Sequence, residues 1–142
     1  MQIVYLLDTD HMSILQRGGT AALPLTLRLS ILADRQIATS IVSYEEQCKG
    51  WLAKTARARD DALLRAYVQL GQHLEIYAGI NVLPYDVRAH TIFQSLRGQR
   101  VRTGTQDLKI AAIALANDAT ILTRNTTDFS RVTNLKFEDW SM

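Results

Sequence analysis

Four acidic residues stand beside short apolar runs that lie far apart along the chain. Asp8 follows the run 3–7, Glu46 comes after the run 37–42, Asp107 opens the run 108–116, and Asp128 follows the run 120–123. Short apolar runs that alternate with helical patterns predict an α/β fold with a parallel sheet, and such sheets bind ligands outside the carboxyl ends of their strands. We therefore expect folding to bring the four carboxylates together as one divalent-cation site.

The spacing of apolar residues predicts one α/β domain over residues 1–142, with helices on a central, mostly parallel sheet of four to five strands. Strands are expected at 3–7, 36–40, 80–83 and 119–122, with a possible edge strand at 135–138. Helices are expected at 10–16, from 23 to about 35, from 43 to about 54, and at 59–77, 86–97 and 108–116.

The helices at 46–54 and 59–77 are expected to form an antiparallel pair that protrudes from the sheet. The second carries a stripe at helical spacing, formed by Leu63, Tyr67, Leu70, Leu74 and Tyr77. The apolar area of this stripe is expected to be larger than one face of the sheet can cover. This indicates that part of the stripe binds a partner protein. The alternative is that it packs wholly on the preceding helix, through Trp51 and Leu52.

Composition excludes several classes of protein. With 47% hydrophobic and 21% charged residues the chain is globular rather than disordered. No apolar run approaches the roughly 20 residues that span a bilayer, and no basic leader precedes the first expected strand, so neither a membrane protein nor a secreted one is expected. A single cysteine fits the reducing cytoplasm.

Basic residues gather around the expected carboxylate site although the net charge is only +2. The cations near Asp107 and Asp128 in sequence are Arg97, Arg100, Arg102, Lys109, Arg124 and Arg131. Carboxylates ringed by cations suit a site that holds a metal and receives a phosphate backbone. The alternative is a solvated face whose charges only keep the protein soluble.

Each carboxylate also has a local explanation. Asp8 could make an Asx-turn or cap the helix that follows it, and Asp128 could cap a short C-terminal turn. Glu46 could complete a capping box with Ser43, and Asp107 could complement a helix dipole. Capping is served equally well by serine, threonine or asparagine, so four acids at strand ends favour a shared role. Carboxylates with few histidine or cysteine neighbours suit Mg²⁺ or Mn²⁺. His11 is the one histidine near the expected site, and a core or surface role is expected for it.

Four motifs in order resemble those of PIN-domain ribonucleases. They are Leu6-Leu7-Asp8-Thr9-Asp10, then Thr39 to Glu46 followed by Gly50, then Gln106 to Ala112, and finally Ile121 to Asn125 through Asp128-Phe129. Size and motif order resemble VapC-type toxins of bacterial toxin–antitoxin pairs over essentially the whole chain. The resemblance implies a PIN-like three-layer α/β domain.

The resemblance also implies a function and its residues. Asp8, Glu46 and Asp107 match the three firmest positions of an acidic site that binds Mg²⁺ or Mn²⁺ and cleaves RNA. Glu46 is preferred to Glu45 because the family glutamate precedes a glycine by four positions, as Glu46 precedes Gly50. The fourth position is filled by Asn125 or by Asp128. The number of metal ions in the site, one or two, therefore stays open.

The function expected from this resemblance is a metal-dependent endoribonuclease, the toxin of a toxin–antitoxin pair. It implies a cytoplasmic homodimer with a small antitoxin partner. Arg97, Arg100, Arg102 and Arg124 are expected to hold the RNA backbone, and single-stranded RNA is the favoured substrate.

Two alternatives are kept. One is a non-catalytic PIN module that binds RNA or a partner. The other is a phosphatase, because Asp8-Thr9-Asp10 after an apolar strand also fits a DxD motif.

Overall fold

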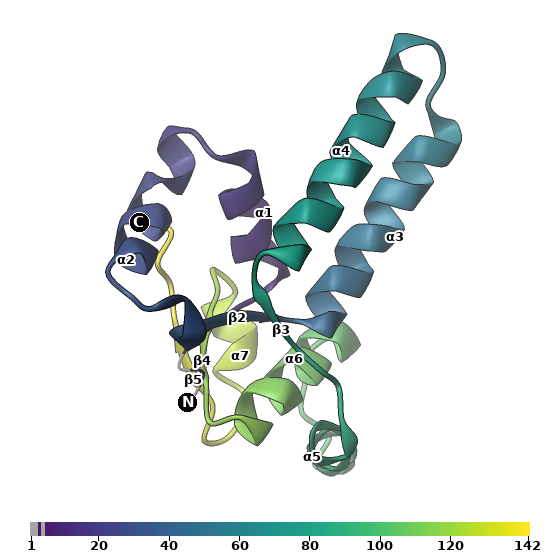
Figure 1. Ribbon diagram of the computed structural model, residues 1–142. Helices are drawn as coiled ribbons and strands as arrows, with labels where there is room; N and C mark the ends of the chain where they lie inside the picture. The colour runs from purple at the N-terminus through teal and green to yellow at the C-terminus, as the bar shows by residue number, and fades with distance from the viewer. Residues whose placement is uncertain (1–2, 4) are drawn as a thin grey trace.

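The sheet of the computed structural model, which describes residue 3 and residues 5–142, is parallel throughout (Figure 1). Its five strands, in the order β3-β2-β1-β4-β5, are β1 (Tyr5–Leu7), β2 (Ile37–Ser40), β3 (Asn81–Leu83), β4 (Thr120–Leu122) and β5 (Lys136–Glu138). The chain moves outward from β1 to β3 and then returns to β4, so the carboxyl ends of β1 and β4 flank the point where strand order reverses. The predicted fold class is confirmed, and Val4 of the predicted first strand lies outside the described residues.

The helices follow the strands in alternation, as predicted. They are α1 (Thr9–Arg17), α2 (Leu23–Ser30), α3 (Ile41–Arg57), α4 (Asp61–Ala78), α5 (Val87–Gly98), α6 (Thr105–Ala116) and α7 (Thr126–Phe129), with single 3₁₀ turns at Thr20–Ala22 and Asp34–Gln36. None of the described helices is long and apolar enough to cross a membrane.

Successive strand residues point into two separate cores, which makes the fold three-layered. Leu6 and Ile121 belong to the core beneath α5 and α6, whereas Leu7 and Leu122 belong to the core beneath α1 and α2. This alternation is the period of two that a β-strand imposes. Helix α6 is buried on almost every side, as its apolar sequence predicted.

The α3–α4 pair stands off the sheet, as predicted (Figure 1). The predicted stripe on α4, however, is mostly uncovered: Tyr67 is 59% exposed and Leu74 is 62% exposed. The covered side of α4 carries Ala66 and His73, each one position before an exposed stripe residue, together with Tyr77, the one member of the stripe that is buried. The alternative in which the stripe packs wholly on the preceding helix is therefore wrong.

Several predicted helix boundaries are also wrong, including the start of α6, which lies at Thr105, and the end of α3, which lies at Arg57. The helix expected to reach about Arg35 ends at Ser30, because the Gln36 side chain accepts a hydrogen bond from the Ala33 N–H at 3.0 Å and closes a separate 3₁₀ turn. Helix α3 begins at Ile41 instead of at Ser43, because the Ser40 hydroxyl accepts the Ser43 N–H at 3.1 Å and caps the helix.

Candidate metal centre

Asp8 lies at the junction of β1 and α1 and is almost fully buried, with 4% of its surface exposed. Its Oδ1 accepts the His11 N–H at 2.8 Å, so it does cap α1, as the local explanation proposed. Burial raises the pKa of Asp8 to about 7, against hydrogen bonds from Thr123 and the His11 backbone that lower it. A cap needs no ionised group in a dry position, so capping does not account for a carboxylate here.

Glu46 occupies the second turn of α3 and is half-buried. Its Oε1 accepts a hydrogen bond from the Thr9 hydroxyl at 2.8 Å. Because Ser40 caps α3, the expected capping box between Ser43 and Glu46 is wrong. Burial raises the pKa of Glu46, and the nearby charge of Asp107 raises it further.

Asp107 lies in the first turn of α6 and links the other carboxylates electrostatically. Its charge raises the pKa of both Asp8 and Glu46, and the charge of Asp128 raises its own. Burial is the largest cause of the raised pKa of Asp107. Folding therefore places Asp107 within electrostatic range of Asp8, Glu46 and Asp128.

Asn125 and Asp128 form a bonded unit next to Asp107. The Asn125 side-chain amide donates to Asp107 Oδ2 at 2.9 Å and to Asp128 Oδ2 at 3.0 Å. Arg131 donates to the other oxygen of Asp128 at 2.8 Å. Both oxygens of Asp128 are thus engaged, which distinguishes it from the other three acids.

A second arginine–carboxylate pair lies on the other side of the site. The Nε and Nη2 atoms of Arg124 each donate to one oxygen of Asp10, at 2.6 Å in both cases. Among the residues that the structure describes, Asp8, Glu46 and Asp107 form no ion pair with lysine or arginine. The acids therefore divide into two that are held by arginine and three that are not.

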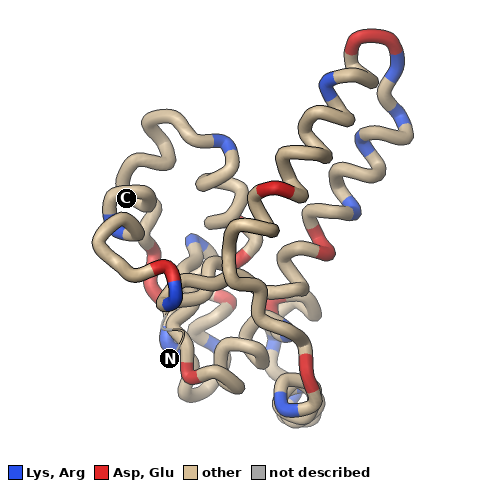
Figure 2. Tube along the Cα trace, in the orientation of Figure 1, with Lys and Arg blue, Asp and Glu red and all other residues tan. Residues whose placement is uncertain are grey.

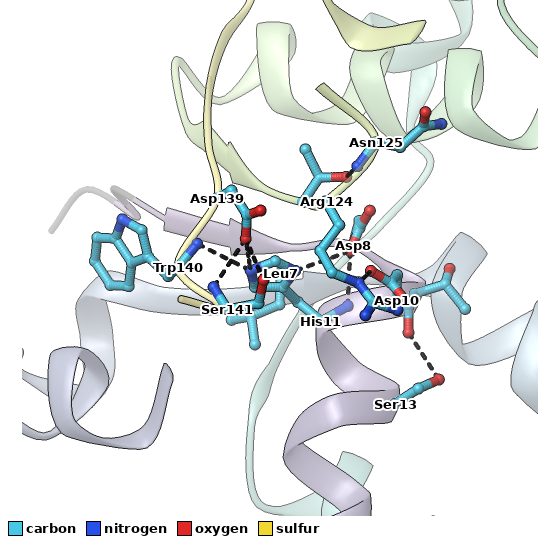
Figure 3. A network of polar contacts seen from close by, with 12 residues as sticks. Leu7, Asp8, Asp10, His11, Ser13, Arg124, Asn125, Asp139, Trp140 and Ser141 are labelled. Atoms are coloured by element: carbon cyan, nitrogen blue, oxygen red, sulfur yellow. Dashed lines mark hydrogen bonds and ion pairs between the residues drawn. The ribbon is translucent and has the colours of Figure 1, made fainter. Parts of the chain in front are cut away.

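Among the described residues, the acid and histidine side chains that bring one ligand atom each within 4.8 Å of one another are Asp8, Asp10 and His11, a group without Glu46 and Asp107. Figure 3 shows why this second grouping is a poor metal site. Arg124 takes both oxygens of Asp10, and the Nε2 atom of buried His11 accepts the Trp140 N–H at 3.2 Å. Burial lowers the pKa of His11, in keeping with the core role expected for it. Asp8, Glu46 and Asp107 form no ion pair with lysine or arginine among the described residues, so they remain the candidate oxygen donors for a hard cation.

Sequence reasoning missed several polar residues that surround these carboxylates. Thr9 bonds Glu46, Thr123 faces Asp8, and Asp10 holds Arg124. The signal that could have found Thr9 and Thr123 is their position, within two residues of the ends of β1 and β4, where the sheet edge opens.

The predicted RNA-binding arginines are not placed alike. Arg97 lies in the last turn of α5 with its guanidinium 5.6 Å from the centre of the Phe93 ring, and exposed Arg100 and Arg102 follow in the loop before α6. Arg131 donates to the Arg102 carbonyl at 2.6 Å, which ties this loop to Asp128. Arg124 differs from them because Asp10 engages it. Basic residues elsewhere are scattered over the trace, including along α3 (Figure 2).

The comparisons with known proteins agree with this geometry, although no family model matches the chain. Ribonuclease VapC1 of Haemophilus influenzae strain R2866 is 28% identical over 142 residues, which cover 98% of this chain and 99% of that protein. VapBC-1 from nontypeable Haemophilus influenzae has a TM-score of 0.76 at 23% identity, covering 99% of this chain and 100% of that one. DNA-bound VapBC from Salmonella typhimurium has a TM-score of 0.75 at 20% identity, covering 98% and 99%. Over almost its whole length this chain is therefore similar in sequence to a VapC ribonuclease, and it has the fold of the VapBC structures.

Proposed function

We propose that this chain is a metal-dependent endoribonuclease, folded as one PIN-like domain over residues 1–142, and the toxin of a toxin–antitoxin pair. The observation that carries the proposal is the group formed by Asp8, Glu46 and Asp107, three carboxylates with raised pKa values and no arginine or lysine partner among the described residues. Clustered acids of this kind cost stability unless a cation binds them. Similarity to a protein named Ribonuclease VapC1 supports the same function.

In this proposal Asp8, Glu46 and Asp107 hold Mg²⁺ or Mn²⁺. When bound there, such a cation would supply Lewis-acid chemistry, lowering the pKa of a water and offsetting charge on the phosphoryl oxygens. Glu46 suits the task of accepting the water's proton, because its raised pKa brings it closer to neutral pH and only Thr9 bonds its Oε1. Asp128, with both oxygens engaged, is proposed as a weaker fourth member that holds Asn125 in place.

The RNA backbone is proposed to cross the loop that carries Arg100 and Arg102 and to reach Arg97 and Arg124. The bond between Arg131 and the Arg102 carbonyl supports this path, since it keeps the basic loop beside the carboxylates. Single-stranded RNA is the proposed substrate, because an A-form duplex hides its base edges in a deep groove.

The proposed partners are a small antitoxin and a second copy of this chain. VapBC complexes from Haemophilus influenzae and Salmonella typhimurium share the fold, which supports an antitoxin partner. A cavity of about 450 Å³ between α1 and the α3–α4 pair offers it a surface; residues lining it include Gln16, Trp51, His73 and Ile76. An RNA substrate and a single cysteine suit the cytoplasm as the location.

Cleavage of single-stranded RNA by the purified protein tests this function. We expect cleavage with Mg²⁺ or Mn²⁺, its loss on chelation, and its recovery when metal is restored. Asp107→Asn should remove the activity. Asp118→Asn is the matched control, because Asp118 is an exposed acid that pairs with Lys136 at the opposite edge of the sheet.

Two experimental outcomes would support one of the alternative functions over the proposed ribonuclease. RNA binding without metal-dependent cleavage would favour the non-catalytic module. Cleavage of small phosphate esters in place of RNA would favour the DxD phosphatase, which the engagement of Asp10 by Arg124 argues against.

A further inference from the structure

Three consecutive residues after β4 each contact a different acid of the site. Thr123 faces Asp8, Arg124 bonds Asp10, and Asn125 bonds Asp107. Thr123 and Asn125 touch members of the proposed metal centre, but the Arg124–Asp10 pair has no role in the function proposed above beyond a general contact with RNA. The pair joins residues 114 positions apart, in α1 and in the segment before α7.

Asp10 binds one edge of the Arg124 guanidinium, and the opposite edge faces away from Asp10. Nε and Nη2 face Asp10, while the Arg124 side chain remains 52% exposed. A bidentate pair fixes the plane of a guanidinium, which a single hydrogen bond does not. The charges of Asp8 and Asp139 also act on Arg124, and Figure 3 shows the Arg124 side chain among Asp8, Asp10 and Asp139.

We propose that Asp10 is a positioning residue that holds Arg124 as a fixed anchor for an RNA phosphate next to the one that is cleaved. This inference rests on the proposed ribonuclease function and deepens it. Nη1, which bonds none of the described residues, and the outer edge of Nη2 are the donors that a phosphate would meet. Asp10 contributes no metal ligand, because Arg124 occupies both of its oxygens.

Two variants separate the positive charge of Arg124 from the fixed orientation of its guanidinium. Arg124→Lys keeps the charge but loses the fork, and Asp10→Asn keeps Arg124 but removes its carboxylate partner. Both variants should bind single-stranded RNA at least as well as the wild type and cleave it with a kcat reduced about tenfold or more, because a small misplacement of substrate is costly. Arg124→Gln should lower both kcat and affinity, and it should reduce the log–log salt slope of binding by about 0.7.

Double substitution supplies the sharpest readout. In the Arg124→Gln background, Asp10→Asn should leave kcat unchanged and strengthen RNA binding, because an unpaired carboxylate then no longer repels phosphate. A further tenfold loss of kcat in the double variant would overturn the inference, since Asp10 would then act independently of Arg124. Lys136→Gln is the matched control, because it removes a paired, exposed cation at the other edge of the sheet and should change nothing.

Titration with Mn²⁺ alone distinguishes the remaining outcomes. Asp10→Asn should keep Mn²⁺ affinity and melting temperature near wild type, as exposed ion pairs add little stability, whereas Asp8→Asn should lose Mn²⁺ affinity. Lost Mn²⁺ affinity in Asp10→Asn would make Asp10 a ligand and overturn the inference. If the wild type cleaves RNA and Arg124→Lys keeps full kcat, the inference alone fails. If the wild type cleaves no RNA with any divalent ion, the proposed function fails and the inference fails with it.

Discussion

Asn125 and Asp107 are joined by a hydrogen bond of 2.9 Å from the amide Nδ2 to the carboxylate Oδ2. This bond lowers the pKa of Asp107 against the burial that raises it. The same amide group donates to Asp128 at 3.0 Å. Asn125 therefore acts as a donor that lets two carboxylates lie side by side, a task that an acid at this position could not perform at neutral pH.

Asn125→Ala should move the pH dependence of cleavage to higher pH. Loss of the amide leaves burial and the charge of Asp128 to raise the pKa of Asp107 further. A protonated Asp107 cannot bind a cation, so activity should fall more at pH 6 than at pH 8. Initial rates over this range, at saturating metal, measure the shift. A loss of equal size at every pH would contradict the proposed role of the amide.

Asp128→Asn should impair cleavage less than Asp107→Asn does. Arg131 and Asn125 engage both oxygens of Asp128, so its substitution disturbs the surroundings of the metal centre rather than a ligand. Outer partners of this kind typically cost about 10- to 100-fold, and we expect the lower end here. Asp107→Asn should reduce kcat to background. Equal and complete loss in both variants would make Asp128 a ligand, and Mn²⁺ titration of both proteins would then show the same defect.

Asp8 should destabilise the metal-free protein at neutral and alkaline pH. Its folded pKa of about 7 lies above the ordinary value of 3.8, so the folded state favours the protonated acid. Stability that this group supplies at low pH is lost as the pH rises from about 3.8 through about 7. Thermal unfolding in chelator should thus show Asp8→Asn to be more stable than wild type at pH 8, with a smaller difference at pH 5.

Asp8→Ala is the matched control for capping. Asparagine caps a helix as well as aspartate does, whereas alanine costs about 1 kcal/mol. Asp8→Ala should therefore be less stable than Asp8→Asn at both pH values. If Asp8→Asn is the less stable protein at pH 8, Asp8 serves mainly as a cap with a favourable charge.

The sheet and its helices could be predicted from the sequence because each element repeats its apolar residues at the period of its own geometry. The location of the site could be predicted for a related reason. Parallel strands end at one edge of the sheet, so residues that follow Leu7 and Leu122 must meet there. Helix boundaries that depend on a single capping side chain could not be predicted from the sequence. Ser40 and Ser43 both fit a helix cap, and only their positions relative to Thr9 and β2 decide between them.

Ion pairs between residues far apart in sequence were the part of the site that the sequence predicted least well. Nothing local distinguishes Arg124 from Arg102, yet Arg124 is held by Asp10 and Arg102 is exposed in a loop. The covered side of α4 was also missed, because Ala66 and His73 look less apolar than Leu63 and Tyr67 but are the residues that pack.

RNA affinity should fall with rising salt, and the basic loop should account for part of the slope. Each phosphate contact contributes about 0.7 to the log–log slope for single strands. Arg100→Gln and Arg102→Gln should each reduce the slope by about that amount, and Arg97→Gln should do the same if its guanidinium leaves the Phe93 ring to reach phosphate. Fluorescence anisotropy in a cleavage-deficient Asp107→Asn background measures it. Salt-insensitive binding would remove these arginines from the RNA path.

The exposed face of α4 should hold a second copy of this chain. Leu64, Tyr67 and Leu74 are 67%, 59% and 62% exposed, and an uncovered apolar face of this kind marks a partner surface. Light scattering of the isolated protein should give a dimer. Tyr67→Glu and Leu74→Glu should give monomers with an unchanged melting temperature, because neither side chain is packed in the monomer. Leu27→Glu, at an equally exposed position on α2, is the control that should remain dimeric. A wild-type protein that is monomeric and captures no co-expressed antitoxin would contradict both partner proposals, while cleavage of RNA by that same monomer would leave the proposed metal centre intact.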